Sequence, residues 1–370
     1  MILRARKTLL LAATLALPLG AQAPTSLADT AFAALSARLS EPPGYFDTDN
    51  LISNEDSYLH VVGTLKRVGV SGGAYIGVGP DQNFSYIAAV RPKVAFIIDI
   101  RRDNLLEHLL FKAIFARSRN RLEYLCLLFG KRAPMDTTGW GAREVGALLA
   151  YIDTVHAANP AMPGAPALDH RNLARARVLE AVIGFGTGDR GMRLAQADIA
   201  TIERFHRAFL NEGPSLRFNT TGRAPQWYYP DFRRLVLETD RTGRQSSFLA
   251  HEEDFQFVKS LEARNLVIPV VGDLAGPKAL AAIGEWVKTR GETVSALYAS
   301  NVEQYLFEGG TFGAFSHTVG GLPRGPKSVI IRSFFRGTLP QSVSGYHATQ
   351  LAQFIDRFVA IESSGGFGSY

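Results

Sequence analysis

The residues best suited to chemistry follow a short apolar run and a glycine turn in the first quarter of the chain. Gly77 and Gly79 lie at the end of the apolar run 74–78, and Asp99 lies 20 residues beyond Gly79. Glycines let a ligand approach the backbone closely, and the N-terminus of a following helix offers unpaired N–H groups. An acid at this distance can bind ribose hydroxyls. The spacing predicts a nucleoside site, although the turn is not the GxGxxG of dinucleotide-binding proteins.

Two strands joined by a helix must position these residues. The runs 74–78 and 94–98 have the continuous apolar character of strands in a sheet that is covered on both faces. A helix-like segment begins at Phe84 and is broken by Pro92, and parallel strands need such a crossover. The alternative is that the glycines only make a tight turn and that Asp99 only caps the next helix.

The same strand-and-helix pattern returns near the C-terminus. Strands are predicted over 266–271, 293–298 and 328–335, and a closing helix over 348–361. Asp273 follows the first of these strands, and Asn301 follows the second. Ligands bind outside the carboxyl ends of the strands in open α/β sheets. The sequence therefore predicts an α/β fold with one shared pocket at these strand ends.

This assembly resembles the class I S-adenosylmethionine-dependent methyltransferases, a Rossmann-like family, over residues 72–117 and 264–335. The resemblance implies a doubly wound, mainly parallel sheet and S-adenosylmethionine as cofactor. It implies methyl transfer to an acceptor that the sequence does not identify. The segment 300–307, SNVEQYLF, resembles the signature of an uncharacterised branch of the family.

The resemblance implies roles in the site for eight residues of this chain. Gly77 and Gly79 would lie under the methionine and ribose, Asp99 would hold the ribose hydroxyls, and Asp273 would face the adenine. Ser300 and Asn301 would be polar residues facing the substrate, and Tyr305 would join them. Asp81 is included with the cofactor-binding residues, although it follows the glycines where the family has an acid before the first strand's glycines.

No catalytic residue follows from the sequence. The asparagine-proline motif of amino-group methyltransferases is absent, and Glu303 and His317 are weak candidates for a base. A non-catalytic exported protein that binds a nucleoside or another ligand on the same scaffold is the second hypothesis. A hydrolase is the third, and it ranks low because no GxSxG elbow joins a predicted strand to a following helix.

The N-terminus has the pattern of a secretory signal over residues 1–23. Basic residues precede the apolar run 8–19, and Ala21-Gln22-Ala23 is a small-residue cleavage pattern. The apolar run is too short to span a membrane. The sequence therefore predicts export to the periplasm or the medium, with no transmembrane segment after cleavage. An uncleaved tail is the alternative.

The composition is that of a globular protein with a large core. The chain has 370 residues, of which 46% are hydrophobic and 20% charged, and its net charge is +6. No common nucleic-acid-binding motif is present, so a small-molecule ligand is the expected partner. The oligomeric state is left open. The single cysteine, Cys126, is expected to be a buried thiol.

The rest of the chain divides around a largely helical insertion. The two parts of the α/β domain are predicted at 24–130 and 246–362, the insertion at 131–245, and a disordered tail at 363–370. The segment before the first strand, around Asn54 to Tyr58, is either a surface loop, which we favour, or a lid over the pocket. The aromatic residues Trp227, Tyr228, Tyr229 and Phe232 either wall a pocket or, more commonly for aromatic residues, pack in the core.

Overall fold

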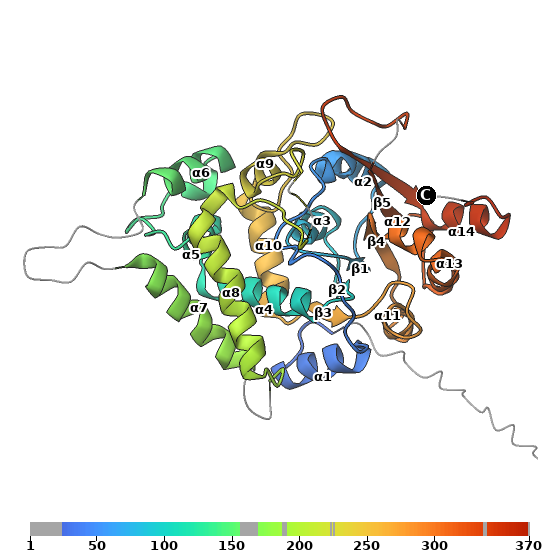
Figure 1. Ribbon diagram of the computed structural model, residues 1–370, viewed down its shortest axis with the longest axis horizontal. Coiled ribbons are helices and arrows are strands. Elements are labelled where there is room, and N and C mark those ends of the chain that lie inside the picture. The colour runs from blue at the N-terminus through green and yellow to red at the C-terminus, as the bar shows by residue number, and fades with distance from the viewer. Residues whose placement is uncertain are drawn as a thin grey trace, which may run out of the picture.

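The chain folds around a six-stranded sheet covered by helices (Figure 1). The structure is a computed structural model, and it describes residues 24–155, 169–186, 191–222, 224, 226–335 and 339–368. The strands follow the order β3-β2-β1-β4-β5-β6. All neighbouring strands are parallel except β5 and β6, which are antiparallel. The strands are β1 (Ala74–Gly77), β2 (Val94–Asp99), β3 (Val267–Val271), β4 (Val294–Ser300), β5 (Val329–Phe335) and β6 (Ala348–Phe354).

Helices connect these strands and form a separate group between β2 and β3. Those in the first part of the chain are α1 (Asp29–Leu39), η1 (Tyr58–Val61), α2 (Val62–Val68), α3 (Gln82–Val90), α4 (Arg102–Arg117) and α5 (Arg121–Leu128). The insertion contains η2 (Trp140–Ala142), α6 (Val145–Thr154), α7 (His170–Gly186), α8 (Gln196–Glu212), η3 (Gly213–Ser215) and α9 (Phe232–Leu237). The last part has α10 (Glu252–Ala263), α11 (Ala279–Lys288), α12 (Val302–Glu308), α13 (Phe312–Gly321) and α14 (Ile355–Ser363).

The sheet is buried on both faces, as the continuous apolar strands predict. Every residue of β1, β2, β3 and β4 is buried. In Figure 1, α3, α4 and α10 lie on one side of the strands, and α11, α13 and α14 lie on the other. The prediction of an α/β fold with a mostly parallel sheet is confirmed.

Pro269 lies inside a strand without disrupting the sheet, because β3 is an edge strand. Proline has no N–H to donate and is therefore tolerated at sheet edges. On this edge the strand packs against α1, and the Ser36 hydroxyl donates to the Pro269 carbonyl.

The closing helix predicted over 348–361 is wrong in its first half. Residues 348–354 form β6, which pairs with β5 along its whole length, and the helix begins only at Ile355. The ladder to β5 gives these residues backbone partners that helix-like local patterning does not anticipate. Phe367, within the segment expected to be disordered, packs against the rings of Phe312 and Phe358.

The segment predicted to be a largely helical insertion does contain helices, among them α6, α7 and α8. An ion pair between Arg102 on α4 and Asp198 on α8 ties the insertion to the α/β part. Cys126 is buried, as expected, and burial raises the pKa of its thiol to about 12. The signal sequence predicted at 1–23 lies outside the described residues. None of the helices in the described ranges has both the length and the hydropathy to cross a bilayer.

Candidate functional site

A cavity of about 330 Å³ lies at the carboxyl ends of four parallel strands. Its floor comes from the carboxyl ends of the parallel strands and the turns that follow them, at residues 78–79, 98–101, 272–274 and 300–302. Its walls come from the segment before β1, from the aromatic residues of the insertion and from the β5–β6 hairpin. The volume is within the range of small-molecule sites.

The cavity brings together most of the residues that the sequence singled out. Six of the eight line it, namely Gly79, Asp99, Asp273, Ser300, Asn301 and Tyr305. Gly77 and Asp81 do not, contrary to our expectation, and each has a different physical reason for its position.

Position 77 has room only for glycine, because the side chain of Asn83 lies against it. A Cβ at this position would lie 1.9 Å from Oδ1 of Asn83. The Asn83 amide donates to the carbonyls of Val78, Gly79 and Pro80 at 2.8–3.0 Å, so it fixes the path of the turn. Asn83 therefore supports the turn beside the cavity, a role that sequence reasoning missed; its polar side chain in an apolar helix was the available signal.

Asp81 points into the protein at the start of α3. It is buried, and burial raises the pKa of its carboxyl to about 7. Gly79 does face the cavity, with φ of +89°, a conformation that favours glycine. Its carbonyl accepts a hydrogen bond from Nε2 of His108 at 2.9 Å. Burial lowers the pKa of His108 to about 4, so this histidine is a neutral support for the turn.

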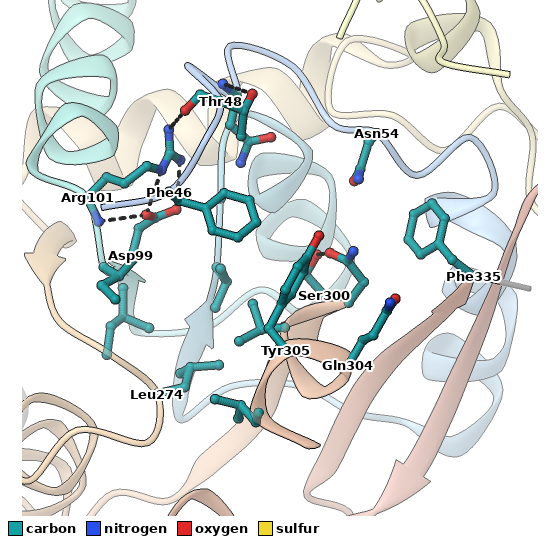
Figure 2. Close-up of a pocket in the computed structure, with 18 of the residues that line it drawn as sticks. Phe46, Thr48, Asn54, Asp99, Arg101, Leu274, Ser300, Gln304, Tyr305 and Phe335 are labelled. Carbon is teal, nitrogen blue, oxygen red and sulfur yellow. Dashed lines mark hydrogen bonds and ion pairs between the residues drawn. The ribbon is translucent and has the colours of Figure 1, made fainter. Parts of the chain in front are cut away.

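Asp99 lines the cavity at the carboxyl end of β2, and its carboxylate is already bound by Arg101. Nε and Nη2 of Arg101 donate to its two oxygens at 3.0 and 2.9 Å, and the backbone N–H of Arg101 adds a third bond at 2.9 Å (Figure 2). Nη1 of the same arginine donates to the carbonyls of Thr48 and Asp49. The pair therefore also anchors the chain segment that covers this part of the cavity.

Asp273 belongs to the turn that starts α11. Its carboxylate accepts the N–H of Ala275 at 2.9 Å, and its own N–H donates to Glu41. Glu41 also accepts the N–H groups of Lys278 and Ala279 at 2.7 and 2.6 Å. These donors are among the unpaired groups of a helix N-terminus, so Glu41 fixes the turn that presents Asp273 to the cavity.

Ser300 ends β4 in a left-handed conformation, with φ of +54°. Such backbone is uncommon for residues other than glycine and marks a position held by its surroundings. The Ser300 hydroxyl donates to the carboxylate of Glu55, which is fully buried. Tyr305, one turn into α12, meets the ring of Phe46 edge to face at 5.0 Å.

The segment before β1 is a wall of the cavity rather than a surface loop. Thr48, Asn50 and Asn54 line the cavity, and Glu55 and Asp56 are buried beside it. Our preferred expectation of a surface loop is therefore wrong. Charged residues normally indicate exposure, but here hydrogen bonds to Glu55 and an ion pair between Asp56 and Arg234 permit burial.

Aromatic rings form the far wall. Tyr228 stacks on His347 with ring centroids 3.5 Å apart, and Phe335 and Tyr229 also line the cavity. Trp227 is 86% exposed beside them. The pocket-wall alternative for this cluster thus holds for Tyr228 and Tyr229.

The two bases that the sequence suggested are not placed to act. The Glu303 carboxylate is buried and bound by Arg332, with Nε contacts of 2.8 and 2.9 Å. His317 is exposed on α13 and does not line the cavity. Within the described ranges, no group of histidine, cysteine and acidic side chains could hold a metal ion.

Residues 51–139 and 218–359, more than half of the chain, match the family described as a domain of unknown function, DUF7790. The chain belongs to the DUF7790 family. No curated protein matches it. Every cavity residue from Asn54 onward lies in the matched segments, and the unmatched residues 140–217 lie within the helical insertion. The cavity is therefore built mainly from the part of the chain that defines the family.

Proposed function

We propose that this protein is a Rossmann-like, class I methyltransferase-like enzyme that binds S-adenosylmethionine in the cavity and methylates a small-molecule acceptor. The observation that carries the proposal is the place of the cavity. It lies at the carboxyl ends of β1 and β4, where the strand order turns from 3-2-1 to 4-5. Doubly wound sheets bind nucleotides and related cofactors at this switch point.

The residues around the cavity fit such a cofactor. Gly79 has no side chain, so a ligand can come close to its backbone. The Asn83 amide donates to the Gly79 carbonyl and fixes the turn. Asp99 Oδ2 accepts one hydrogen bond, from Arg101, and a carboxylate oxygen has a further lone pair for a ribose hydroxyl. Asp273 and Leu274 line the cavity after β3, and in this proposal they would face the adenine.

The cofactor itself supplies an activated methyl group, so the protein's task is positioning. The glycine turn and Asp99 would orient the cofactor, and the walls would hold the acceptor in line with the methyl group. Alignment of this kind can remove a large share of the activation barrier to group transfer. The aromatic wall would keep water away from the reacting atoms.

Calorimetric titration with S-adenosylmethionine and S-adenosylhomocysteine tests the proposal. We expect micromolar affinity, and a loss of affinity in Asp273→Ala and in Asp99→Asn, which keeps the shape of the side chain that Arg101 contacts. Asp356→Asn is the matched control, because Asp356 is an exposed acid on α14. Absence of binding by a well-folded sample would overturn the cofactor assignment.

A non-catalytic ligand-binding protein on the same scaffold is the second candidate. The observation that favours it is the bidentate pair of Arg101 with Asp99, which occupies the acid that such cofactors need. This candidate predicts affinity for a nucleoside or another small ligand without any methyl transfer.

A further inference from the structure

Glu55 is a buried carboxylate surrounded by neutral donors. The Tyr298 hydroxyl donates to Oε2 at 2.7 Å, the Gln350 amide donates to Oε2 at 2.9 Å, and Ser333 Oγ lies 2.6 Å from the same atom. The Ser300 hydroxyl donates to Oε1. The four partners lie on β4, β5 and β6, so hydrogen bonds from three neighbouring strands hold the carboxylate in place.

Within the described ranges, this carboxylate has no arginine, lysine or histidine as a hydrogen-bond partner. Its four hydrogen bonds act to lower its pKa and are outweighed by burial. The other titratable groups that face it are the tyrosines Tyr75 on β1, Tyr86 on α3 and Tyr298 on β4, whose pKa values burial holds well above normal. Burial likewise raises the pKa of Glu55, because an unpaired charge is costly away from water.

Ser300 connects Glu55 to the cavity. Of the four partners, it alone lines the cavity. Its hydroxyl can donate to Glu55 and accept from a group in the cavity at the same time, because a hydroxyl has one proton and two lone pairs.

The part of the cavity beyond Tyr305 is aromatic, and no acid, lysine or arginine is among the described residues that line it. In Figure 2, Asn54, Gln304 and Phe335 lie on one side of Tyr305, and Asp99, Arg101 and Leu274 lie on the other. The stacked rings of Tyr228 and His347 add to the aromatic wall. Amide side chains and flat rings suit a neutral aromatic molecule with a polar substituent.

We infer that this part of the cavity takes an aromatic hydroxyl compound, and that Glu55 accepts its proton through Ser300. The acceptor's O–H bond breaks as its proton passes to Ser300 Oγ, and the Ser300 proton passes to Glu55. The electron pair left on the acceptor oxygen would form the new bond to the methyl group, while the bond between that methyl group and the cofactor's sulfur would break with its electron pair staying on sulfur. Glu55 is then a neutral carboxylic acid until its proton leaves to water. The inference rests on the methyl transfer proposed above.

The first experiment uses 4-nitrophenol as the probe, without any methyl donor, and records the visible absorbance of its phenolate as the pH is varied. We expect the wild-type protein to bind the probe and to lower its apparent pKa by about one unit or more, which is a tenfold change in the ionised fraction. Glu55→Gln and Ser300→Ala should each abolish this shift. Glu262→Gln is the matched control, because Glu262 is an equally buried acid that does not line the cavity, and its shift should equal that of the wild type.

The outcomes separate this inference from the proposed function. Equal spectra for the wild type and both cavity variants would overturn the role of Glu55, and so would failure of the folded wild type to bind the probe. Ser300→Ala removes one hydroxyl and no charge, so it keeps the test valid if Glu55→Gln does not fold. Failure of S-adenosylmethionine to bind overturns the methyl transfer alone, since the probe is measured without it.

Discussion

Arg101 binds both carboxylate oxygens of Asp99 at the end of β2, and its remaining donors hold the backbone of Thr48 and Asp49. Both side chains are 7% exposed. One ion pair thus joins the floor of the cavity to the segment that walls it, and it limits how far Asp99 can turn toward a ligand.

Arg101→Met should destabilise the protein by about 3–5 kcal/mol, because it leaves the Asp99 carboxylate buried without its partner. Urea unfolding measures this change. Arg233→Met, which removes a pair with Asp153 in which both side chains are partly exposed, is the control and should cost about 1 kcal/mol or less. Equal losses in the two variants would contradict the prediction.

The pair of Glu303 with Arg332 joins α12 to β5 in the same buried way. Arg332→Met alone should cost about 3–5 kcal/mol, since it leaves a buried charge. The double variant Glu303→Leu/Arg332→Met should recover most of that loss, because apolar side chains of similar size replace both charges. Chemical unfolding of all four proteins completes the cycle. A double variant no more stable than the single one would show that the pair has another role.

Gly77→Ala should destabilise the protein by about 1–3 kcal/mol or more, because the added Cβ would overlap Oδ1 of Asn83 and force the turn to shift. Gly146→Ala in α6 is the matched control. Its Cβ would meet only Leu237 at 3.8 Å, and alanine favours a helix, so stability should be unchanged or rise. Thermal melts of both variants measure these changes. A melting temperature of Gly77→Ala equal to that of the wild type would contradict the steric role of Gly77.

Asp81→Asn should change how stability depends on pH. The pKa of Asp81 is raised from 3.8 to about 7 in the folded protein, so the folded state holds this proton more tightly than the unfolded state. Its contribution is therefore fully present below pH 3.8 and is lost as the pH rises through about 7. The stability of the wild type minus that of the variant should fall across this interval and stay level above it. Urea unfolding across this pH range gives the difference, from which the other buried acids and histidines, common to both proteins, cancel. A difference that does not vary with pH would contradict the assignment.

The predicted signal sequence can be tested by finding where the N-terminal segment of the chain is cut. We expect a cut after Ala21 or Ala23 when the full chain is produced in a secreting bacterial host, because both alanines follow the apolar run. Mass spectrometry of the intact protein from the periplasm and the medium reads the cut directly. An uncut chain confined to the cytoplasm would remove the export prediction.

The sequence by itself determined the parallel strands of the sheet and their carboxyl edge. Continuous apolar runs forced strands that are buried on both faces, and parallel pairing then brought Gly79, Asp99, Asp273 and Ser300 to one edge. These features could be predicted because they depend on local patterning and on the general geometry of parallel sheets. The α6, α7 and α8 helices were predictable for the same reason.

Only the tertiary structure decided what each polar side chain does at that edge. Glu55 and Ser300 are 245 positions apart in the chain, and no local pattern predicts that they meet. Asp99 has the spacing of a ribose ligand, yet its partner Arg101 became visible only once both were buried together. Residues 348–354 became a strand because β5 offered an unpaired edge. Partner choice for buried polar groups is set by contacts between distant segments, and these follow from packing rather than from sequence spacing.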